Sequence, residues 1–286
     1  MTPTPGAPEP GVRRFAERAV GPVVRWTDTS WPRRGSRVWR ADAADGLVSY
    51  VKVHLNDRFH GREVTAYRTW VPGLGAAAPR LVAADARLGA VVVTAVPGRP
   101  LSDGTRRAPD EERALFVRIG ALAAAIHGSA PARPSCEDEG PPVRKLDRHL
   151  DGARAHLAPG DEEFVLALAA RSAALPPLEP VPTHGDFQLR NLLWSGRLAV
   201  IDFERSEAQP ALRDLVRLSD AWAGRPDLHE AFLTGYGRRP TPLEEERLAV
   251  DSALDAVSGV AYGAAEGDPE VLARGLRTLA RLRAAS

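Results

Sequence analysis

Hydrophobic and polar positions follow two different periods along the chain. In the first third they alternate: residues 47–54 place β-branched or aromatic side chains at every second position, which predicts a strand. Asp45-Gly46, directly before it, is typical of a hairpin turn. The other segments expected to be extended are 23–26, 35–41, 79–83 and 90–95. With helices expected over 12–19 and 59–71, the pattern predicts a five-stranded antiparallel sheet with one inserted helix.

After residue 100 the apolar positions repeat at helical spacing instead. Pro109, followed by three acidic residues, is typical of a helix start, because proline fits the first turn and carboxylates face the positive end of the helix dipole. The segments expected to be helical are 109–128, 146–157, 161–175, 212–223, 227–236, 242–262 and 269–282. Residues 131–142 are expected to form a loop. The fold class predicted is α+β, with a sheet lobe followed by a mostly helical lobe.

One short hairpin is expected to interrupt the helical part. Two apolar runs, 192–194 and 198–201, flank Gly196, which suits the first central position of a type II′ turn. A turn centred on Gly196-Arg197 pairs Asn191 with Asp202, whose Cβ atoms would then lie roughly 4.5–5.5 Å apart. The two side chains would leave the same end of the hairpin together.

Composition sets limits on this picture. The 286 residues, 44% hydrophobic and 26% charged, are ordinary for a soluble globular protein. No apolar run approaches the ~20 residues that span a bilayer, so no membrane partner is expected. Residues 1–11 lack a hydrophobic signal core and are expected to form a flexible tail. We expect a nucleotide-binding lobe over 12–96 and a catalytic, substrate-binding helical lobe over 97–286. Cys136 is the single cysteine, which excludes an internal disulfide and favours a reducing cytoplasm.

Charge is unevenly distributed, although the net charge is only +1. Residues 1–100 carry 15 Lys or Arg against 8 Asp or Glu, a net charge of +7, and residues 101–286 carry −6. The basic part could attract a polyphosphate and the acidic part a cationic substrate, while uneven solvation explains the pattern equally well. The sequence has no dense basic run and no motif of stacking aromatic residues, which disfavours nucleic-acid binding.

The hairpin region carries the strongest chemical pattern. Asp186 lies on the incoming loop and is the candidate general base for a hydroxyl group. Asn191 and Asp202 are candidate magnesium ligands, because magnesium takes a few protein oxygens and fills its other positions with phosphates and water. His184 is expected to brace the loop through backbone hydrogen bonds. The alternative is an ordinary loop aspartate beside a hairpin capped by two polar residues.

A second set of candidates lies in the predicted sheet. The chain has only two lysines, Lys52 and Lys145, so a strand lysine in an arginine-rich chain suggests a need for a compact ammonium. We expect Lys52 to meet a phosphate and a carboxylate of the next helix, Glu63; an exposed lysine and a locally paired glutamate are the alternatives. Ser36, with Gly35, could form a turn over phosphates, although no P-loop motif is present. Backbone groups of the link from Thr94 to Val96 could read an adenine edge, or form a plain connector.

Together these residues resemble the aminoglycoside phosphotransferase and choline kinase-like family, which has a two-lobe protein kinase-like fold. His184, Gly185, Asp186 and Asn191 meet its HGDxxxxN pattern, and Ile201-Asp202-Phe203-Glu204 its metal motif. Lys52, Glu63 and Val96-Pro97-Gly98 match the strand lysine, its helix partner and the segment after the hinge. Asp214 resembles the buried aspartate that braces the catalytic loop. The resemblance spans roughly residues 20–284.

The resemblance implies a magnesium-dependent kinase that uses ATP or GTP and acts on a hydroxyl group of a small molecule. The expected acceptor is an antibiotic of the aminoglycoside, peptide or nucleoside type, which would give resistance. The alternatives are a metabolite kinase for choline, homoserine or a sugar, and a catalytically silent nucleotide-binding module. A monomer or weak dimer is expected. The candidate acceptor residues in the helical lobe are Asp255, Glu266, Glu230, Trp222 and Tyr262.

Overall fold

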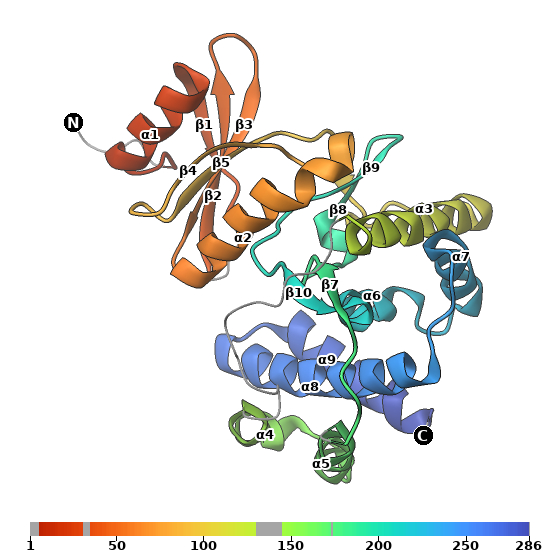
Figure 1. The fold of residues 1–286 in the computed structure, drawn as a ribbon. Helices are drawn as coiled ribbons and strands as arrows, with labels where there is room; N and C mark the ends of the chain where they lie inside the picture. Colours follow the sequence, from red (N-terminus) through yellow and green to blue (C-terminus); the bar gives the residue numbers. More distant parts are fainter. Residues whose placement is uncertain (1–5, 31–34, 130–144, 173, 286) are drawn as a thin grey trace. The chain divides into compact units, whose positions relative to one another are not determined.

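The computed structural model describes residues 6–30, 35–129, 145–172 and 174–285. Contacts divide the described residues into two compact units (Figure 1). One unit joins segments that are far apart in the sequence, within 1–108, 122–131 and 182–207. The other unit lies within 109–121, 132–181 and 208–286. The predicted hairpin therefore belongs to the same unit as the sheet, and the lobe boundary predicted at residues 96–97 stays a prediction.

A five-stranded antiparallel sheet forms the centre of the first unit, in the order β1-β2-β3-β5-β4. The strands are β1 (Val23–Asp28), β2 (Ser36–Ala43), β3 (Val48–His54), β4 (Leu81–Asp85) and β5 (Ala90–Thr94). Val51 of β3 is fully buried in an apolar core that helix α1 (Pro10–Val20) completes through Phe15. Because successive strand residues point to opposite faces, Lys52 and His54 lie on the other face of the sheet.

Helix α2 (Asp57–Thr69) packs on that second face. Its first turn is capped by Asn56, whose side chain accepts a hydrogen bond from the backbone N–H of Arg58. The buried positions follow the helical period: His60, Glu63, Val64, Ala66 and Tyr67. The predicted helix over 59–71 is confirmed but ends earlier, because Pro72 cannot continue it and a 3₁₀ segment, η1 (Val71–Ala77), follows.

Short strands complete the first unit around the hairpin. The strands β6 (Arg99–Pro100), β8 (Leu192–Trp194) and β9 (Leu198–Val200) form a three-stranded sheet in the order β6-β8-β9. A further two-stranded sheet pairs β7 (Pro180–Thr183) with β10 (Glu207–Pro210), and each of these two strands includes residues of both units. These strands were not predicted, because β6, β7 and β10 are each only two to four residues long and too short to show alternation.

The second unit is helical, as predicted. Its helices are α3 (Pro109–His127, which continues into the first unit), α4 (Leu146–Ala153), α5 (Asp161–Ser172), α6 (Leu215–Leu218), α7 (Pro226–Tyr236), α8 (Pro242–Glu266) and α9 (Pro269–Ala284). Helix α8 begins at a capping box formed by Thr241 and Glu244 and ends at Gly267, in a left-handed conformation. The loop predicted over 131–142 lies outside the described residues.

One predicted helix of this unit is wrong as a single element. Residues 212–223 instead form three short pieces: η5 (Ala211–Asp214), α6 and η6 (Ser219–Trp222). The hydroxyl of Ser219 donates to the carbonyl of Val216 at 3.2 Å. Such a local bond competes with the helical hydrogen-bond ladder, which the spacing of apolar residues cannot reveal.

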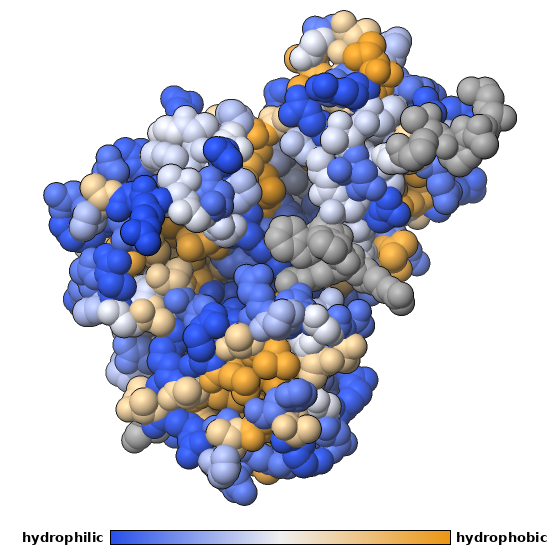
Figure 2. All heavy atoms as spheres, turned by 180° about the vertical axis from the view of Figure 1, so that it is seen from behind, coloured by the Kyte–Doolittle hydropathy of each residue, from blue (hydrophilic) through white to orange (hydrophobic). Residues whose placement is uncertain are grey.

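The main core of the second unit lies between α4, α5, α8 and α9. Its buried side chains include Leu150, Val165, Val257 and Leu279. On the face drawn in Figure 2, an apolar area interrupts the polar surface over this helical region. Among the described residues, no helix combines the length and apolar character needed to cross a membrane.

Two glycines allow helices α3 and α7 to approach closely. A Cβ atom built on Gly235 of α7 would lie 1.8 Å from the carbonyl oxygen of Val117, and one on Gly120 of α3 would lie 2.0 Å from that of Phe232. Both distances are far below van der Waals contact. Any larger residue at these positions therefore forces the helix backbones apart.

We expect Gly235→Ala to lower the free energy of unfolding by at least about 1–3 kcal/mol, because backbone atoms cannot yield to the new methyl group. Gly61→Ala in α2 is the matched control: this glycine is also helical, but nothing lies within 4 Å of its added Cβ. The control should gain about 0.5–1 kcal/mol. Urea unfolding of both variants measures the contrast, and equal effects would contradict close helix packing at Gly235.

Candidate active site

The catalytic-loop candidate begins at His184, directly after β7, and its second residue must be glycine. Gly185 adopts φ +77°, and an added Cβ would lie 2.0 Å from the carbonyl oxygen of Arg205. A residue with a side chain would therefore suffer both backbone strain and a clash. The glycine lets the chain turn tightly between His184 and Asp186.

His184 is fully buried, and its ring bonds two backbone groups. Its Nδ1 accepts from the backbone N–H of Asp186 at 3.2 Å, and its Nε2 lies 2.9 Å from the carbonyl oxygen of Ile201. A ring with its hydrogen on Nε2 satisfies both bonds. His184 thus ties the loop to the end of the hairpin, as predicted.

Asp186 is 3% exposed, and both of its carboxylate oxygens have donors. Oδ1 accepts from Gln188 Nε2 at 2.6 Å, and Oδ2 accepts from Arg190 Nη2 at 2.7 Å and Asn191 Nδ2 at 3.0 Å. These contacts fix the orientation of the carboxylate. Gln188 and Arg190 were not predicted as site residues, because they occupy the unspecified positions of the motif between Asp186 and Asn191 and carry no spacing signal.

The hairpin exists, but its predicted register is wrong by one residue. Strands β8 and β9 pair Leu193 with Ala199, and the backbone N–H of Ile201 donates to the carbonyl of Asn191 at 3.0 Å. The loop therefore has three residues, with Gly196 at φ +84°, instead of a two-residue type II′ turn. Asn191 lies opposite Ile201, and Asp202 is one residue further along.

Asp202 has an unusual backbone conformation. Its φ of +73° is the only positive value for a non-glycine residue in the described part of the chain. This region costs such a residue of order 1–3 kcal/mol, and such residues cluster at functional sites. The carboxylate turns to the sheet, where its Oδ1 accepts from Lys52 Nζ at 2.5 Å.

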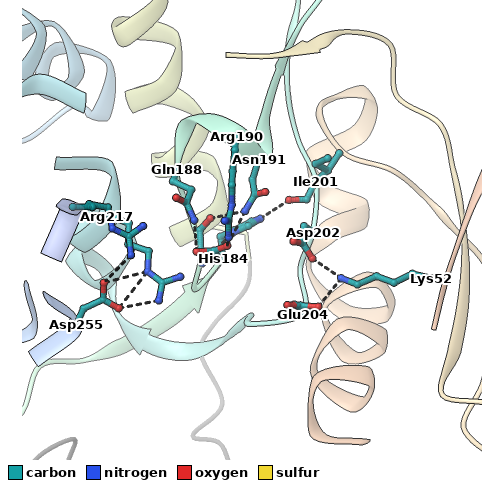
Figure 3. Close-up of polar contacts among 12 residues, drawn as sticks. Lys52, His184, Gln188, Arg190, Asn191, Ile201, Asp202, Glu204, Arg217 and Asp255 are labelled. Carbon is teal, nitrogen blue, oxygen red and sulfur yellow. Dashed lines mark hydrogen bonds and ion pairs between the residues drawn. The ribbon is translucent and has the colours of Figure 1, made fainter. Parts of the chain in front are cut away.

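Lys52 is 7% exposed and lies among three carboxylates, two of which, Asp202 and Glu204, are drawn in Figure 3. Besides Asp202, its Nζ lies 2.8 Å from Glu204 Oε2 and 3.3 Å from Glu63 Oε2. Burial alone would lower the pKa of Lys52, but the three carboxylates outweigh burial and raise it well above its ordinary value. The ammonium therefore stays charged, and the predicted pair of Lys52 and Glu63 is present.

Glu63 is held by two partners. Burial would raise its pKa, but the Lys52 ammonium and a hydrogen bond from His54 lower it to about 2. His54 Nε2 lies 2.6 Å from Glu63 Oε2. His54 was not among the predicted site residues, and Glu204 was named only as part of the metal motif, because their partners lie on other elements.

Phe203 packs the hairpin end against α2 by aromatic contacts. It is fully buried, and its ring lies 5.3 Å from that of Tyr67, 5.2 Å from Trp70 and 4.9 Å from His184. The distances are typical of aromatic pairs. The residue between Asp202 and Glu204 thus fixes the position of both carboxylates.

The predicted nucleotide-binding backbone segments have defined places in the first unit. Ser36 begins β2 opposite His54, and the carbonyl of Gly35 accepts from the backbone N–H of Leu55 at 3.2 Å. Thr94 ends β5, and its hydroxyl oxygen accepts from the backbone N–H of Arg80 at 2.9 Å. Val96 follows and is half-buried. Their roles toward a nucleotide stay predictions.

The predicted acceptor residues belong to the second unit, and the structure disfavours Asp255 among them. Arg217 binds the Asp255 carboxylate at 2.9–3.3 Å, and Arg274 lies 3.8 Å away. Burial would raise the pKa of Asp255, but these arginines and Arg213 lower it below its ordinary range. A carboxylate neutralised in this way is poorly suited to bind a cationic acceptor.

The other acceptor candidates have different surroundings. Trp222 contacts Phe116, Phe232 and His229, with the His229 ring stacked at 5.1 Å, so it serves a local aromatic cluster. Tyr262 is 40% exposed, Glu266 is exposed one turn later on α8, and Glu230 is exposed and pairs with Arg239. Asp214 is buried in η5. The predicted bracing of the catalytic loop by Asp214 stays a prediction.

The fit to magnesium can be tested on the oxygen atoms. Within the described ranges, no group of three or more His, Cys, Asp or Glu residues has metal-binding geometry. The predicted pair needs only two protein oxygens: Asn191 Nδ2 donates to Asp186, which leaves its amide oxygen for another partner, and Asp202 uses Oδ1 for Lys52. One amide and one carboxylate oxygen form a donor set that suits a hard cation bound mainly by phosphates and water.

Comparison with known proteins identifies the family. The model of the phosphotransferase enzyme family matches residues 52–249. No curated protein sequence matches the chain. The fold is similar to a thermostable mutant of aminoglycoside phosphotransferase APH(4)-Ia (TM-score 0.70, 16% identity, 96% of this chain and 99% of that chain covered).

Two further solved structures share the fold. One is choline kinase LicA from Streptococcus pneumoniae, with a TM-score of 0.68, 17% identity, and 94% of this chain and 98% of that chain covered. The other is macrolide 2'-phosphotransferase type I, with a TM-score of 0.61, 18% identity, and 92% of this chain and 93% of that chain covered. The predicted α+β, protein kinase-like fold is therefore confirmed. The family match covers more than half of the chain and includes Lys52, Asp186 and Asp202. The chain therefore belongs to the phosphotransferase enzyme family.

Proposed function

We propose that the enzyme transfers the γ-phosphoryl group of ATP or GTP to its acceptor with Mg²⁺ as cofactor. One observation carries this proposal: Lys52 of β3 and Asp202 of the hairpin end meet at 2.5 Å. A cation suited to phosphate oxygens and a carboxylate suited to a metal ion thus lie side by side. A solved structure with this fold is described as a ternary complex with ADP and hygromycin B, which supports a nucleotide donor.

The proposed roles follow from the chemistry of each side chain. Lys52, held by Glu63, contacts phosphate oxygens of the nucleotide. Asn191 and Asp202 hold Mg²⁺, which supplies charge neutralisation when it is bound.

Asp186 orients the acceptor hydroxyl and accepts its proton. A general base must lie within hydrogen-bond reach of the proton that it takes. Gln188, Arg190 and Asn191 all donate to the Asp186 carboxylate and keep it aimed before the acceptor arrives. Such preorganisation reduces the reorganisation needed in the transition state.

For the acceptor we propose an antibiotic, and modification would then give resistance. The solved structures with this fold include aminoglycoside and macrolide phosphotransferases, which supports this class. A choline kinase is also among them, so a metabolite kinase is the second candidate. The third, a silent nucleotide-binding module, is disfavoured because Lys52, Glu63, Asp186, Asn191 and Asp202 are all present. Cytoplasmic location and a monomer or weak dimer stay predictions.

A nucleotide-consumption screen tests the proposal. We expect the wild type to consume ATP or GTP with one class among aminoglycosides, macrolides, peptide and nucleoside antibiotics, choline, homoserine and sugars, and mass spectrometry should detect one added phosphoryl group. Asp186→Asn should lower turnover by about 10²–10⁴-fold while nucleotide still binds, because only proton acceptance is lost. A turnover rate in Asp186→Asn equal to that of the wild type would contradict the role of Asp186 as the general base.

The proposed phosphate contact of Lys52 can be tested with the second lysine of the chain, Lys145, as the control. We expect Lys52→Met to lower kcat/KM for the nucleotide by at least about 100-fold, or about 2.7 kcal/mol, because the compact charge is lost. Lys145→Met is the control, since Lys145 is exposed. Steady-state kinetics with varied nucleotide measures both. Equal kcat/KM for the wild type and Lys52→Met would remove Lys52 from the site.

Thermal unfolding with nucleotide tests the metal ligands. At a ligand concentration of about 100 times Kd, binding stabilises the native wild type by about 2.7 kcal/mol. We expect Asp202→Asn to lose most of the part that depends on Mg²⁺, because the carboxylate that would hold the ion is gone. Nucleotide with EDTA gives the metal-free baseline for each protein. A Mg²⁺-dependent rise in Tm that persists in Asp202→Asn would contradict the metal site.

A further inference from the structure

His54 is a buried histidine that the proposed reaction does not yet use. It lies two residues after Lys52 on β3, so both side chains project from the same face of the sheet. Its side chain is 0% exposed, which leaves it no contact with water. It lies between two of the carboxylates that surround Lys52: Glu63 of α2 and Glu204 after the hairpin.

The bonds of His54 differ on its two sides. Its Nε2 lies 2.6 Å from Glu63 Oε2, a short hydrogen bond in which the ring donates to the ionised carboxylate. Its Nδ1 lies 3.7 Å from Glu204 Oε2, beyond hydrogen-bond distance, and has no hydrogen-bond partner in the part of the chain that the structure describes. The ring is therefore committed to Glu63.

The same oxygen of Glu63 serves both Lys52 and His54. The distance from Glu63 Oε2 to Lys52 Nζ is 3.3 Å, longer than its distance to His54 and longer than the contacts of Lys52 with Asp202 and Glu204. The lysine alone therefore holds Glu63 only weakly. The firm contact that fixes the Glu63 carboxylate is His54.

We propose that His54 is a positioning residue of the phosphotransferase: it holds the Glu63 carboxylate so that Lys52 stays aimed at the nucleotide phosphates. The proposal rests on the proposed function. Nucleotide phosphates bound at Lys52 would compete with Asp202 for the ammonium, and Glu63 would then take a larger share in holding it. Glu63 can do so only if its own carboxylate is fixed independently of Lys52.

The surroundings of His54 hold the ring in place. The ring of His60 packs edge-on against it at 5.8 Å and is itself near the carbonyl of Ala90 at 3.2 Å. The backbone N–H of His54 donates to the carbonyl of Gly89 at 2.9 Å, and a Cβ on Gly89 would lie 2.9 Å from the carbonyl oxygen of His54. The backbone at the end of β3 is thus fixed by its contacts with Gly89, and this fixes the position from which His54 contacts Glu63.

Two variants of His54 separate positioning from packing. His54→Gln keeps an amide donor close to the place of Nε2, and His54→Leu keeps a side chain of similar size without a donor. The full-length protein is tested with AMP-PNP and Mg²⁺ by calorimetry, and nucleotide hydrolysis gives kcat and KM. We expect His54→Leu to weaken Mg²⁺-AMP-PNP binding by about tenfold and His54→Gln to stay within about twofold of the wild type.

A double-mutant cycle with Glu63→Gln shows whether His54 acts through Glu63. If it does, His54→Leu changes Kd little further in the Glu63→Gln background. Urea unfolding of the four proteins without nucleotide measures the same coupling in stability and confirms that each variant is folded. Coupling in Kd together with rescue by glutamine supports the positioning role.

Three results would overturn it. The first is a Kd for Mg²⁺-AMP-PNP in His54→Leu equal to that of the wild type, while Glu63→Gln binds weakly. This result would contradict the role of His54 but not the proposed function. The second is an equal loss of Mg²⁺-AMP-PNP affinity in His54→Leu and His54→Gln that adds to the loss caused by Glu63→Gln. His54 would then serve only in packing. The third is a wild type that binds no AMP-PNP with Mg²⁺, which contradicts the proposed function itself and, with it, the role of His54.

Discussion

The arrangement of the first unit depends on the ion pairs of the buried Lys52 ammonium. This ammonium joins three separate parts of the chain: its own strand β3, helix α2 through Glu63, and the segment after the hairpin through Asp202 and Glu204. Removing charges from water costs several kcal/mol per ion, so each member is stable only while the others are present. One ammonium among three carboxylates also leaves an excess of negative charge. That excess favours a further cation at this place, as the proposed magnesium site requires.

A buried ion cluster in the second unit shows the contrasting case. Asp255 of α8 receives three hydrogen-bond contacts from Arg217, and Arg274 and Arg213 add positive charge around it. Here positive groups outnumber the carboxylate, and nothing in the arrangement calls for a cation. Each cluster contains a charged group surrounded by partners of opposite charge, but only the cluster at Lys52 has an excess of negative charge. The sign of the excess, rather than burial itself, separates a candidate magnesium site from an arginine-rich structural cluster.

The sequence predicted most elements because their signals are local. Alternation in β3 and the helix starts at Pro109 of α3 and Pro242 of α8 each depend on a few neighbouring residues. The partners of Asp186 and Glu63 could not be predicted in the same way. Gln188 and Arg190 lie at positions where many residues fit, and His54 meets Glu63 only after α2 has packed on the sheet. Such contacts depend on tertiary packing, which one sequence does not encode in its spacing.

The hairpin shows how a local signal can be correct and still give the wrong register. Gly196 has the positive φ that was expected, but a left-handed glycine suits a three-residue loop as well as a type II′ turn. A shift of one residue turns every following side chain to the opposite face, which by itself would aim Asp202 away from the face assumed for it. The positive φ of Asp202 ends the alternation at this residue, so its carboxylate is free of that rule and reaches Lys52. The backbone strain of Asp202, of order 1–3 kcal/mol, is thus offset by the ion pair with Lys52.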